Sequence, residues 1–142
     1  MCIVYRGYIT SGSFGHFQAH QYDLRSGGGK DWLLGLSKTR ESVTKLNHLV
    51  TSAHTNVGLP AVAVSLFPVT NCHNKELTNP GALSHIHSLV DRGFIPVIHG
   101  DVVLDSQMKC TVYGGDSILK WSVSIFPYIT QHKISYLMVP GW

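Results

Sequence analysis

The sequence predicts an α/β fold: a three-layer sandwich with a mainly parallel sheet. Apolar, β-prone runs alternate with helical patterns from one end of the chain to the other, as in strand–helix–strand units. Two of these runs, residues 61–67 and 94–99, are almost entirely apolar or small, which is typical of strands buried on both faces. Because the chain has no internal repeat, low-complexity tract or linker, we expect one domain over residues 1–142.

The composition excludes several classes of protein. The chain has 142 residues, of which 44% are hydrophobic and 13% are charged, so it can form a core and is not a disordered chain. Its 11 Lys and Arg residues are scattered, which predicts no nucleic-acid partner. No apolar run reaches the roughly 20 residues that span a bilayer. The cysteines Cys2, Cys72 and Cys110 are odd in number and far apart, which favours a reducing, cytoplasmic location over a disulfide scaffold or a zinc finger.

The first half of the chain predicts two strands and two helices. Residues 2–8 predict a short strand, and residues 16–24 a helix that the glycines after Ser26 end. Residues 30–38 fit either a short packed turn or part of a lid. Residues 39–53 predict a helix, followed by the strand at 61–67. The apolar stripe of this helix, expected to face the core, is Val43, Leu46, Leu49, Val50 and Ala53.

The second half continues the alternation. Polar residues 70–79 predict a loop, and Pro80 can start a helix that ends at Gly93. After the strand at 94–99, residues 102–104 stay extended. Further elements are predicted as a strand at 109–113, a helix at 117–126 and a last strand at 133–139.

Polar, glycine-bearing junctions follow three of the predicted strands, at residues 11–16, 100–101 and 114–116. Ligands of parallel sheets gather beyond the carboxyl ends of the strands. In Gly12-Ser13-Phe14-Gly15-His16, glycine lets backbone N–H groups approach a ligand, and a following helix adds positive partial charge. This combination suits an anion, most of all a phosphate, although a plain strand-to-helix turn would have the same residues.

Four segments in order resemble the isopentenyl phosphate kinases, members of the amino acid kinase superfamily. The first is the Gly12–His16 loop, followed by Ala19, Tyr22 and Leu24. The most specific is Gly93-Phe94-Ile95-Pro96-Val97-Ile98-His99-Gly100-Asp101-Val102-Val103-Leu104-Asp105. The others are Val43-Thr44-Lys45-Leu46-Asn47 with Gly58-Leu59-Pro60-Ala61, and Tyr113-Gly114-Gly115-Asp116-Ser117-Ile118, which is similar to the family's Ser-Gly-Asp-Asp-x-Ile loop. The resemblance covers residues 10–130 and implies an amino acid kinase-like fold.

The resemblance implies ATP-dependent phosphorylation of isopentenyl phosphate to isopentenyl diphosphate, with Mg²⁺, in isoprenoid biosynthesis. It implies that His16 is the catalytic contact to the substrate phosphate, that Ser11, Gly12 and Gly115 contact the substrate, and that Gly12 faces the ATP phosphates. Asp116 is the other expected cofactor contact, and Gly15, Gly100 and Asp101 are expected to support the site. No metal ligand is assigned. Such a site suits phosphoryl transfer, which needs alignment and charge stabilisation more than covalent chemistry.

Each of these residues also has a structural interpretation. His16 could cap or pack a helix, and Asp101 and Asp116 could serve turns or caps instead of ordering the phosphate loops or a Mg²⁺-bound water. Tyr22, like Phe14 and Phe17, fits either the border of a pocket for an isoprenoid tail or the core.

The chain departs from the family at both ends. No lysine precedes Gly12, where the family has Lys-x-Gly-Gly-Ser, and Tyr136–Trp142 does not match the family's Thr-Asp-Val-Asp-Gly-Val-Tyr. We therefore expect an incomplete domain, the substrate-binding portion, that is marginally stable and weakly active alone. The alternatives are a kinase for a related small molecule and a non-catalytic remnant that binds a partner or a phosphate ligand. Because the superfamily often dimerises, a homodimer is also predicted.

Overall fold

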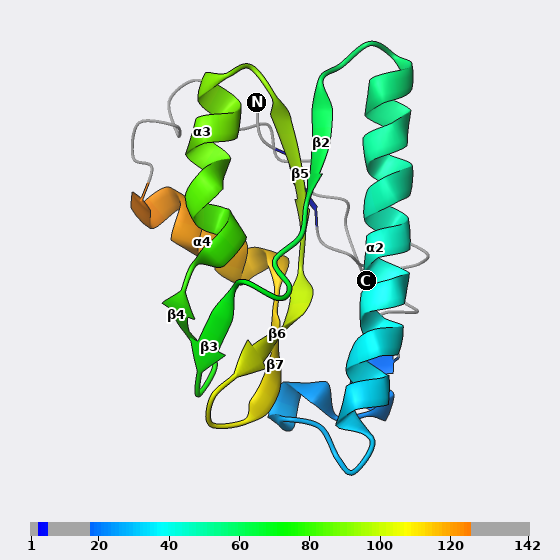
Figure 1. Cartoon of the computed structure of the whole chain (residues 1–142), viewed down its shortest axis with the longest axis vertical. Helices are drawn as coiled ribbons and strands as arrows, with labels where there is room; N and C mark the ends of the chain where they lie inside the picture. Colours follow the sequence, from blue (N-terminus) through cyan, green and yellow to red (C-terminus); the bar gives the residue numbers. More distant parts are fainter. Residues whose placement is uncertain (1–2, 6–17, 126–142) are drawn as a thin grey trace.

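The computed structural model describes residues 3–5 and 18–125, which form two sheets with helices on both sides (Figure 1). The first sheet has the strand order β1-β5-β2, and the second has the order β4-β3-β6-β7. The strands are β1 (Ile3–Tyr5), β2 (Ala61–Val64), β3 (Asn71–His73), β4 (Glu76–Asn79), β5 (Ile95–His99), β6 (Asp101–Asp105) and β7 (Lys109–Tyr113). The α-helices are α2 (Trp32–Asn56), α3 (Ile86–Asp91) and α4 (Gly115–Ile125), and the 3-10 helices are η1 (Leu24–Ser26) and η2 (Gly81–His85).

Strand β5 is the centre of the first sheet. It pairs in parallel with β1 and with β2, so that Val97 lies between Ile3 and Ala63. All five residues of β5 are buried, which agrees with the unbroken apolar run that predicted it. Strand β2 is shorter than predicted because it ends at Val64, although Leu66 beyond it is still fully buried.

Gly100 connects the two sheets, because it alone separates β5 of the first sheet from β6 of the second. Strand β6 pairs in parallel with β3 and antiparallel with β7. The predicted loop at residues 70–79 is wrong, because this segment forms the antiparallel hairpin β3–β4. Its strands are short and mostly exposed, so their sequence is polar, and the turn between them has positive φ at Asn74 (49°) and Lys75 (70°).

Helix α2 begins earlier than predicted, at Trp32, so residues 30–38 include its first turns. Trp32 and Leu36 join a core cluster with residues of β6 and β7, which supports the packed alternative over a lid. The predicted apolar stripe is correct for Val43 and Leu46 but wrong for Leu49, whose side chain is 56% exposed. Ala53 is exposed as well. The buried face instead consists of Gly35, Leu36, Thr39, Val43, Leu46 and Asn47.

The core has a layer on each face of β5, which confirms the three-layer expectation (Figure 1). On one face, Val97 packs with Leu46 of α2. On the other face, Ile98 packs with Ile86 of α3 and Ile118 of α4. Alternate residues of a strand point to opposite faces of its sheet, so one buried strand supplies both layers.

The remaining helices follow the sequence with small shifts. Residues 18–21 are helical, and a turn leads into η1, so the predicted helix at 16–24 ends early in its described part. The helix expected from Pro80 is present as η2 followed by α3, and α4 starts at Gly115 instead of residue 117. The predicted strand at 133–139 lies outside the described residues. Within the described part of the chain, we find no helix with both the length and the apolar character needed to cross a membrane.

Candidate functional site

The structure describes four of the residues predicted for the site: Gly100, Asp101, Gly115 and Asp116. The glycine-rich loop that contains Ser11, Gly12, Gly15 and His16 lies outside the described residues, as do Phe14 and Phe17. Tyr22 is described, and it packs against the core cluster of Leu24 and Leu36 rather than standing apart from it.

Two of the three glycine-bearing junctions lie next to each other. A Cβ atom built on Gly100 would lie 3.1 Å from the backbone nitrogen of Gly115 and 3.3 Å from Cα of Gly114. The residue after β5 therefore lies close to the start of α4, with too little space between them for a side chain on Gly100. The N–H groups of the first turn of a helix have no partner within the helix and carry its positive partial charge, which favours an anion at this end.

Asp116 is exposed in the first turn of α4, where the helix dipole stabilises a carboxylate. Gly115, next to it, is buried. The carbonyl of Gly114 accepts from the N–H groups of Ser117 (3.0 Å) and Ile118 (3.1 Å) and so begins the helical bonding of α4. Among the described residues, no group of three or more His, Cys, Asp or Glu side chains is placed to hold a metal ion.

Asp101 begins β6 and is only 2% exposed. Its carboxylate forms an ion pair with Arg40 of α2 and accepts a 2.8 Å hydrogen bond from the N–H of Val102. Burial raises the pKa of Asp101 above its ordinary value, and the nearby His99 and Arg40 oppose this increase without cancelling it. The carboxylate is therefore bonded to other groups of the protein, which fits the ordering of a loop and not the binding of a metal.

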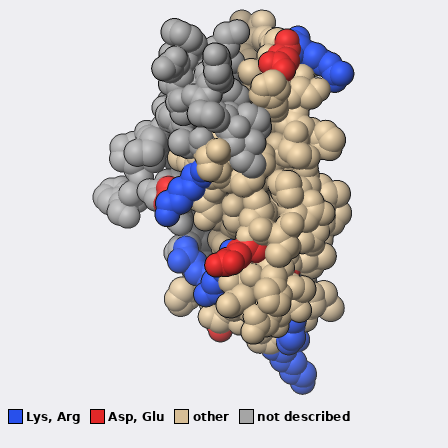
Figure 2. All heavy atoms as spheres, turned by 90° about the vertical axis from the view of Figure 1, so that its left-hand side faces the viewer, with Lys and Arg blue, Asp and Glu red and all other residues tan. Residues whose placement is uncertain are grey.

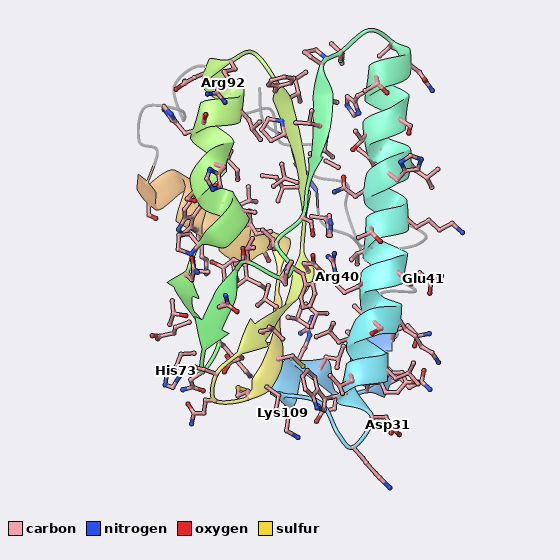
Figure 3. All side chains as sticks on the ribbon, viewed as in Figure 1. Asp31, Arg40, Glu41, His73, Arg92 and Lys109 are labelled. Carbon is pink, nitrogen blue, oxygen red and sulfur yellow. The ribbon has the colours of Figure 1, made fainter. Side chains whose placement is uncertain are left out.

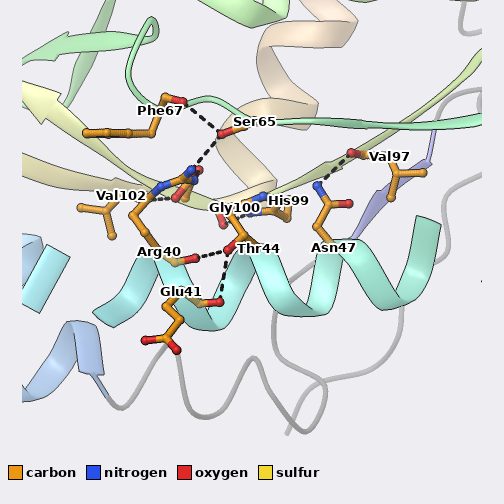
Figure 4. A network of polar contacts seen from close by, with 11 residues as sticks. Arg40, Glu41, Thr44, Asn47, Ser65, Phe67, Val97, His99, Gly100 and Val102 are labelled. Atoms are coloured by element: carbon orange, nitrogen blue, oxygen red, sulfur yellow. Dashed lines mark hydrogen bonds and ion pairs between the residues drawn. The ribbon is translucent and has the colours of Figure 1, made fainter. Parts of the chain in front are cut away.

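Arg40 joins three segments of the chain (Figure 4). Besides the ion pair with Asp101, its guanidinium donates a 3.1 Å hydrogen bond to Oγ of Ser65 and lies 5.2 Å from the centre of the Phe67 ring. Oγ of Ser65 in turn donates to the carbonyl of Phe67 at 3.0 Å. Figure 3 shows Arg40 directed from α2 toward the strands and Glu41 directed away from them.

Sequence reasoning missed Arg40 and His99. Nδ1 of the fully buried His99 lies 2.8 Å from the carbonyl oxygen of Gly100. The signal for Arg40 is its position on α2: it lies four residues after Leu36 and three before Val43, which places a cation on the buried face of the helix. A cation at such a position indicates an anionic partner elsewhere in the chain.

Charges on the surface are dispersed rather than gathered. On the face shown in Figure 2, Lys and Arg side chains form small separate groups with Asp and Glu side chains close to some of them. No continuous basic surface is visible on that face.

Comparison with known proteins gives a consistent result. No family model matches the sequence. The chain is 37% identical over 112 residues to an isopentenyl phosphate kinase of Arabidopsis thaliana, which covers 78% of this chain and 34% of that protein. It is 33% identical over 125 residues to an isopentenyl phosphate kinase of Methanothermobacter thermautotrophicus, covering 82% of this chain and 47% of that protein. The chain thus spans less than half the length of these relatives.

Solved structures agree with the sequence comparison. A crystal structure of an isopentenyl phosphate kinase superposes with a TM-score of 0.73 at 30% identity, over 89% of this chain and 52% of that one. The product complex of the Thermoplasma acidophilum isopentenyl phosphate kinase gives a TM-score of 0.69 at 25% identity, over 89% and 50% of the two chains. In sequence and in its amino acid kinase fold, this chain is therefore a relative of the isopentenyl phosphate kinases, matched over part of their length.

Proposed function

We propose that this chain carries the acceptor-phosphate site of an ATP-dependent kinase that converts isopentenyl phosphate to isopentenyl diphosphate. The observation that carries the proposal is the close approach of Gly100 to Gly115 at the start of α4. This approach brings two of the predicted phosphate-binding junctions together, in a chain related to isopentenyl phosphate kinases. A helix of 11 residues, α4, provides the positive end that an anionic acceptor needs.

The roles that we propose follow from the chemistry of phosphoryl transfer. The N–H of Gly115 and the backbone of Ser11 bind the acceptor phosphate, and His16 donates a hydrogen bond that holds this phosphate in line. Gly12 faces the phosphates of ATP, and Gly15 lets the loop approach its ligand closely. Gly100 and Asp101 support the site from the junction between β5 and β6. Correct alignment of donor and acceptor supplies much of the rate enhancement in such reactions.

Asp116 is the described carboxylate that suits Mg²⁺, because it is exposed at the start of α4. Mg²⁺ usually binds through one or two carboxylates together with the phosphates of a nucleotide, so a dedicated cage of ligands is not required. When bound, the ion neutralises charge on the phosphates of ATP. We also propose a cytoplasmic location, since the described cysteines Cys72 and Cys110 are free and buried, and a homodimer.

Calorimetric titration of the whole chain tests the proposal. The chain is titrated separately with isopentenyl phosphate, with inorganic phosphate and with ATP–Mg²⁺, and turnover is followed as ADP formed with both substrates present. We expect isopentenyl phosphate to bind, and the His16→Ala variant to bind it at least about tenfold more weakly, since a hydrogen bond to a charged group contributes about 1.5–3 kcal/mol. The control is His20→Ala, an exposed histidine four residues further on.

The possible outcomes separate the alternatives. A folded chain that binds no isopentenyl phosphate would contradict the proposal. Binding of isopentenyl phosphate without binding of ATP would favour a phosphate-binding protein that lacks kinase activity. ATP binding with a preference for another acceptor would favour a related small-molecule kinase.

A further inference from the structure

We propose that Arg40 is a positioning residue for the acceptor-phosphate site, acting through Asp101 to hold Gly100 against the first turn of α4. The inference rests on the proposed function of this site. The sequence motifs do not include Arg40, which lies 61 residues before its partner Asp101.

The first step is the convergence of three segments on one guanidinium. Arg40 comes from the middle of α2, Asp101 from the first residue of β6, and Ser65 and Phe67 from the connection that follows β2. A guanidinium has several N–H donors in a fixed plane, so it can hold two acceptors in a defined relation, whereas an ammonium cannot reproduce this geometry. The Arg40 side chain is 18% exposed and that of Asp101 is fully buried, so solvent weakens the ion pair little.

The second step leads from the ion pair to the site. Asp101 directly follows Gly100, whose backbone lies next to Gly114 and Gly115, with no room between them for an unstrained Cβ atom. A shift of Asp101 therefore moves the residue that packs against the first turn of α4. A Cβ atom built on Gly100 would lie 3.1 Å from the backbone nitrogen of Gly115, so little space separates the two backbones. A displacement of Gly100 therefore changes the surroundings and the direction of the Gly115 N–H, on which phosphate binding depends.

The third step concerns charge. Asp101 places a buried carboxylate one residue away from a surface that we expect to bind a phosphate. An uncompensated negative charge there would repel the ligand. Pairing with Arg40 neutralises the carboxylate, so the helix N-terminus determines the local potential.

The test compares Arg40→Met and Arg40→Lys with the control Lys45→Met in the whole chain. Lys45 is an exposed cation of the same helix, so its replacement changes the net charge equally. Isopentenyl phosphate binding is measured by calorimetry under conditions in which circular dichroism shows each variant to be folded. The backbone amide resonances of Gly100, Gly115 and Asp116 are recorded by NMR.

We expect Arg40→Met to weaken isopentenyl phosphate binding by about ten- to a hundredfold, the range expected when a hydrogen bond to a charged group is lost. Its Gly115 and Asp116 resonances should shift. Arg40→Lys keeps the charge but not the planar fork, so it should bind more tightly than Arg40→Met and less tightly than the wild type. Lys45→Met should change neither the affinity nor the resonances.

The result that overturns the inference is unchanged affinity in folded Arg40→Met, or an unshifted Gly115 resonance. A merely structural role for Arg40 would lower stability and leave the affinity of the folded molecules unchanged. If the wild-type chain itself binds no isopentenyl phosphate, the proposed function fails together with this inference. Wild-type binding that Arg40→Met leaves intact overturns the inference alone.

Discussion

At the scale of single residues, Asp105 shows how one carboxylate organises two turns. It ends β6 and is 3% exposed. It accepts hydrogen bonds from the N–H groups of Asn74 (3.1 Å) and Lys75 (2.8 Å) in the β3–β4 turn, and of Gln107 and Met108 (both 2.9 Å) in the β6–β7 turn. Burial alone would raise the pKa of Asp105, but these N–H groups outweigh it and the pKa is lowered.

We predict that Asp105→Asn lowers the free energy of unfolding by about 2 kcal/mol at pH 7, because an amide cannot accept all these bonds and hydrogen bonds to a charged group contribute about 1.5–3 kcal/mol. A lowered native pKa means that the ionised carboxylate stabilises the fold above its unfolded pKa of about 3.9, and that this stabilisation is lost as the pH falls through the native pKa. Urea unfolding is measured at pH 7 and at pH 3. The difference in the free energy of unfolding between wild type and variant should be smaller at pH 3.

The control for this charge effect is Asp31→Asn. Asp31 is exposed at the N-terminus of α2 and makes no side-chain capping bond there. Its replacement should change the free energy of unfolding by less than about 0.5 kcal/mol. If the difference in the free energy of unfolding between wild type and Asp105→Asn does not change with pH, the shape of the side chain matters and its charge does not.

At the scale of helices and strands, the sequence best predicts the elements whose residues are all buried. Strand β5 was predicted closely because both of its faces are buried and its residues are almost all apolar. The hairpin β3–β4 was not, because one face of each short strand is exposed and its residues resemble those of a loop. The start of α2 was missed because it carries the exposed Leu33 and Leu34 and a glycine, which obscure the helical stripe.

The residues of the candidate site likewise include some that the sequence predicts and others that it does not. Gly100 and Gly115, which the sequence places after two predicted strands, lie close together, although the strand before Gly115 is β7, which pairs antiparallel with β6 outside the parallel sheet. Their role in binding a ligand stays a prediction. The ion pair of Arg40 with Asp101 could not be predicted, because it depends on how α2 crosses β6 and on a partner far away in the sequence. The position of Arg40 on the buried face of α2 indicates that it has an anionic partner, but the sequence does not indicate which residue that partner is.

Gly35 determines how α2 packs on the segment before it. A Cβ atom there would lie 2.4 Å from both Cβ and Cγ of Tyr22. Alanine is favoured over glycine in a helix by about 1 kcal/mol, but overpacking costs about 1–3 kcal/mol. The clash involves the inner atoms of Tyr22, which cannot rotate away, so packing should prevail.

We therefore predict that Gly35→Ala lowers the free energy of unfolding by about 1–2 kcal/mol, net of the gain in helix propensity. Thermal or urea unfolding followed by circular dichroism measures this change. The matched control is Gly29→Ala, because nothing lies within 4 Å of a Cβ atom at Gly29. That control should be neutral or slightly stabilising. A stabilised Gly35→Ala variant would show that Tyr22 yields more easily than its contacts indicate.

At the scale of the whole molecule, β5 lies between two apolar layers and contributes buried side chains to both. Val97 and Ile98 are adjacent and fully buried, and they face α2 and the α3–α4 layer respectively. Each side has an intrinsic reporter: Trp121 of α4 packs against the cluster of Ile98, and Trp32 reports on α2 from a third cluster, which the start of this helix shares with β6 and β7. One strand common to both layers predicts that they unfold as one unit.

The last prediction tests this cooperativity with single-tryptophan proteins. Trp142 is replaced by Phe throughout, and either Trp32 or Trp121 is kept as the reporter of urea unfolding. The two proteins lack different partly buried tryptophans, so the comparison is made within each protein: a single cooperative unit requires tryptophan fluorescence and circular dichroism to give the same midpoint. Ile98→Val, which removes one methylene from the shared strand, should lower the free energy of unfolding by about 1 kcal/mol for both reporters alike. Val57→Ala, at a side chain that is 73% exposed, should leave both midpoints nearly unchanged. Fluorescence and circular dichroism midpoints that differ within one protein, or a response to Ile98→Val at Trp121 alone, would mean that α2 and the layer under α3 and α4 unfold independently and that β5 does not couple them.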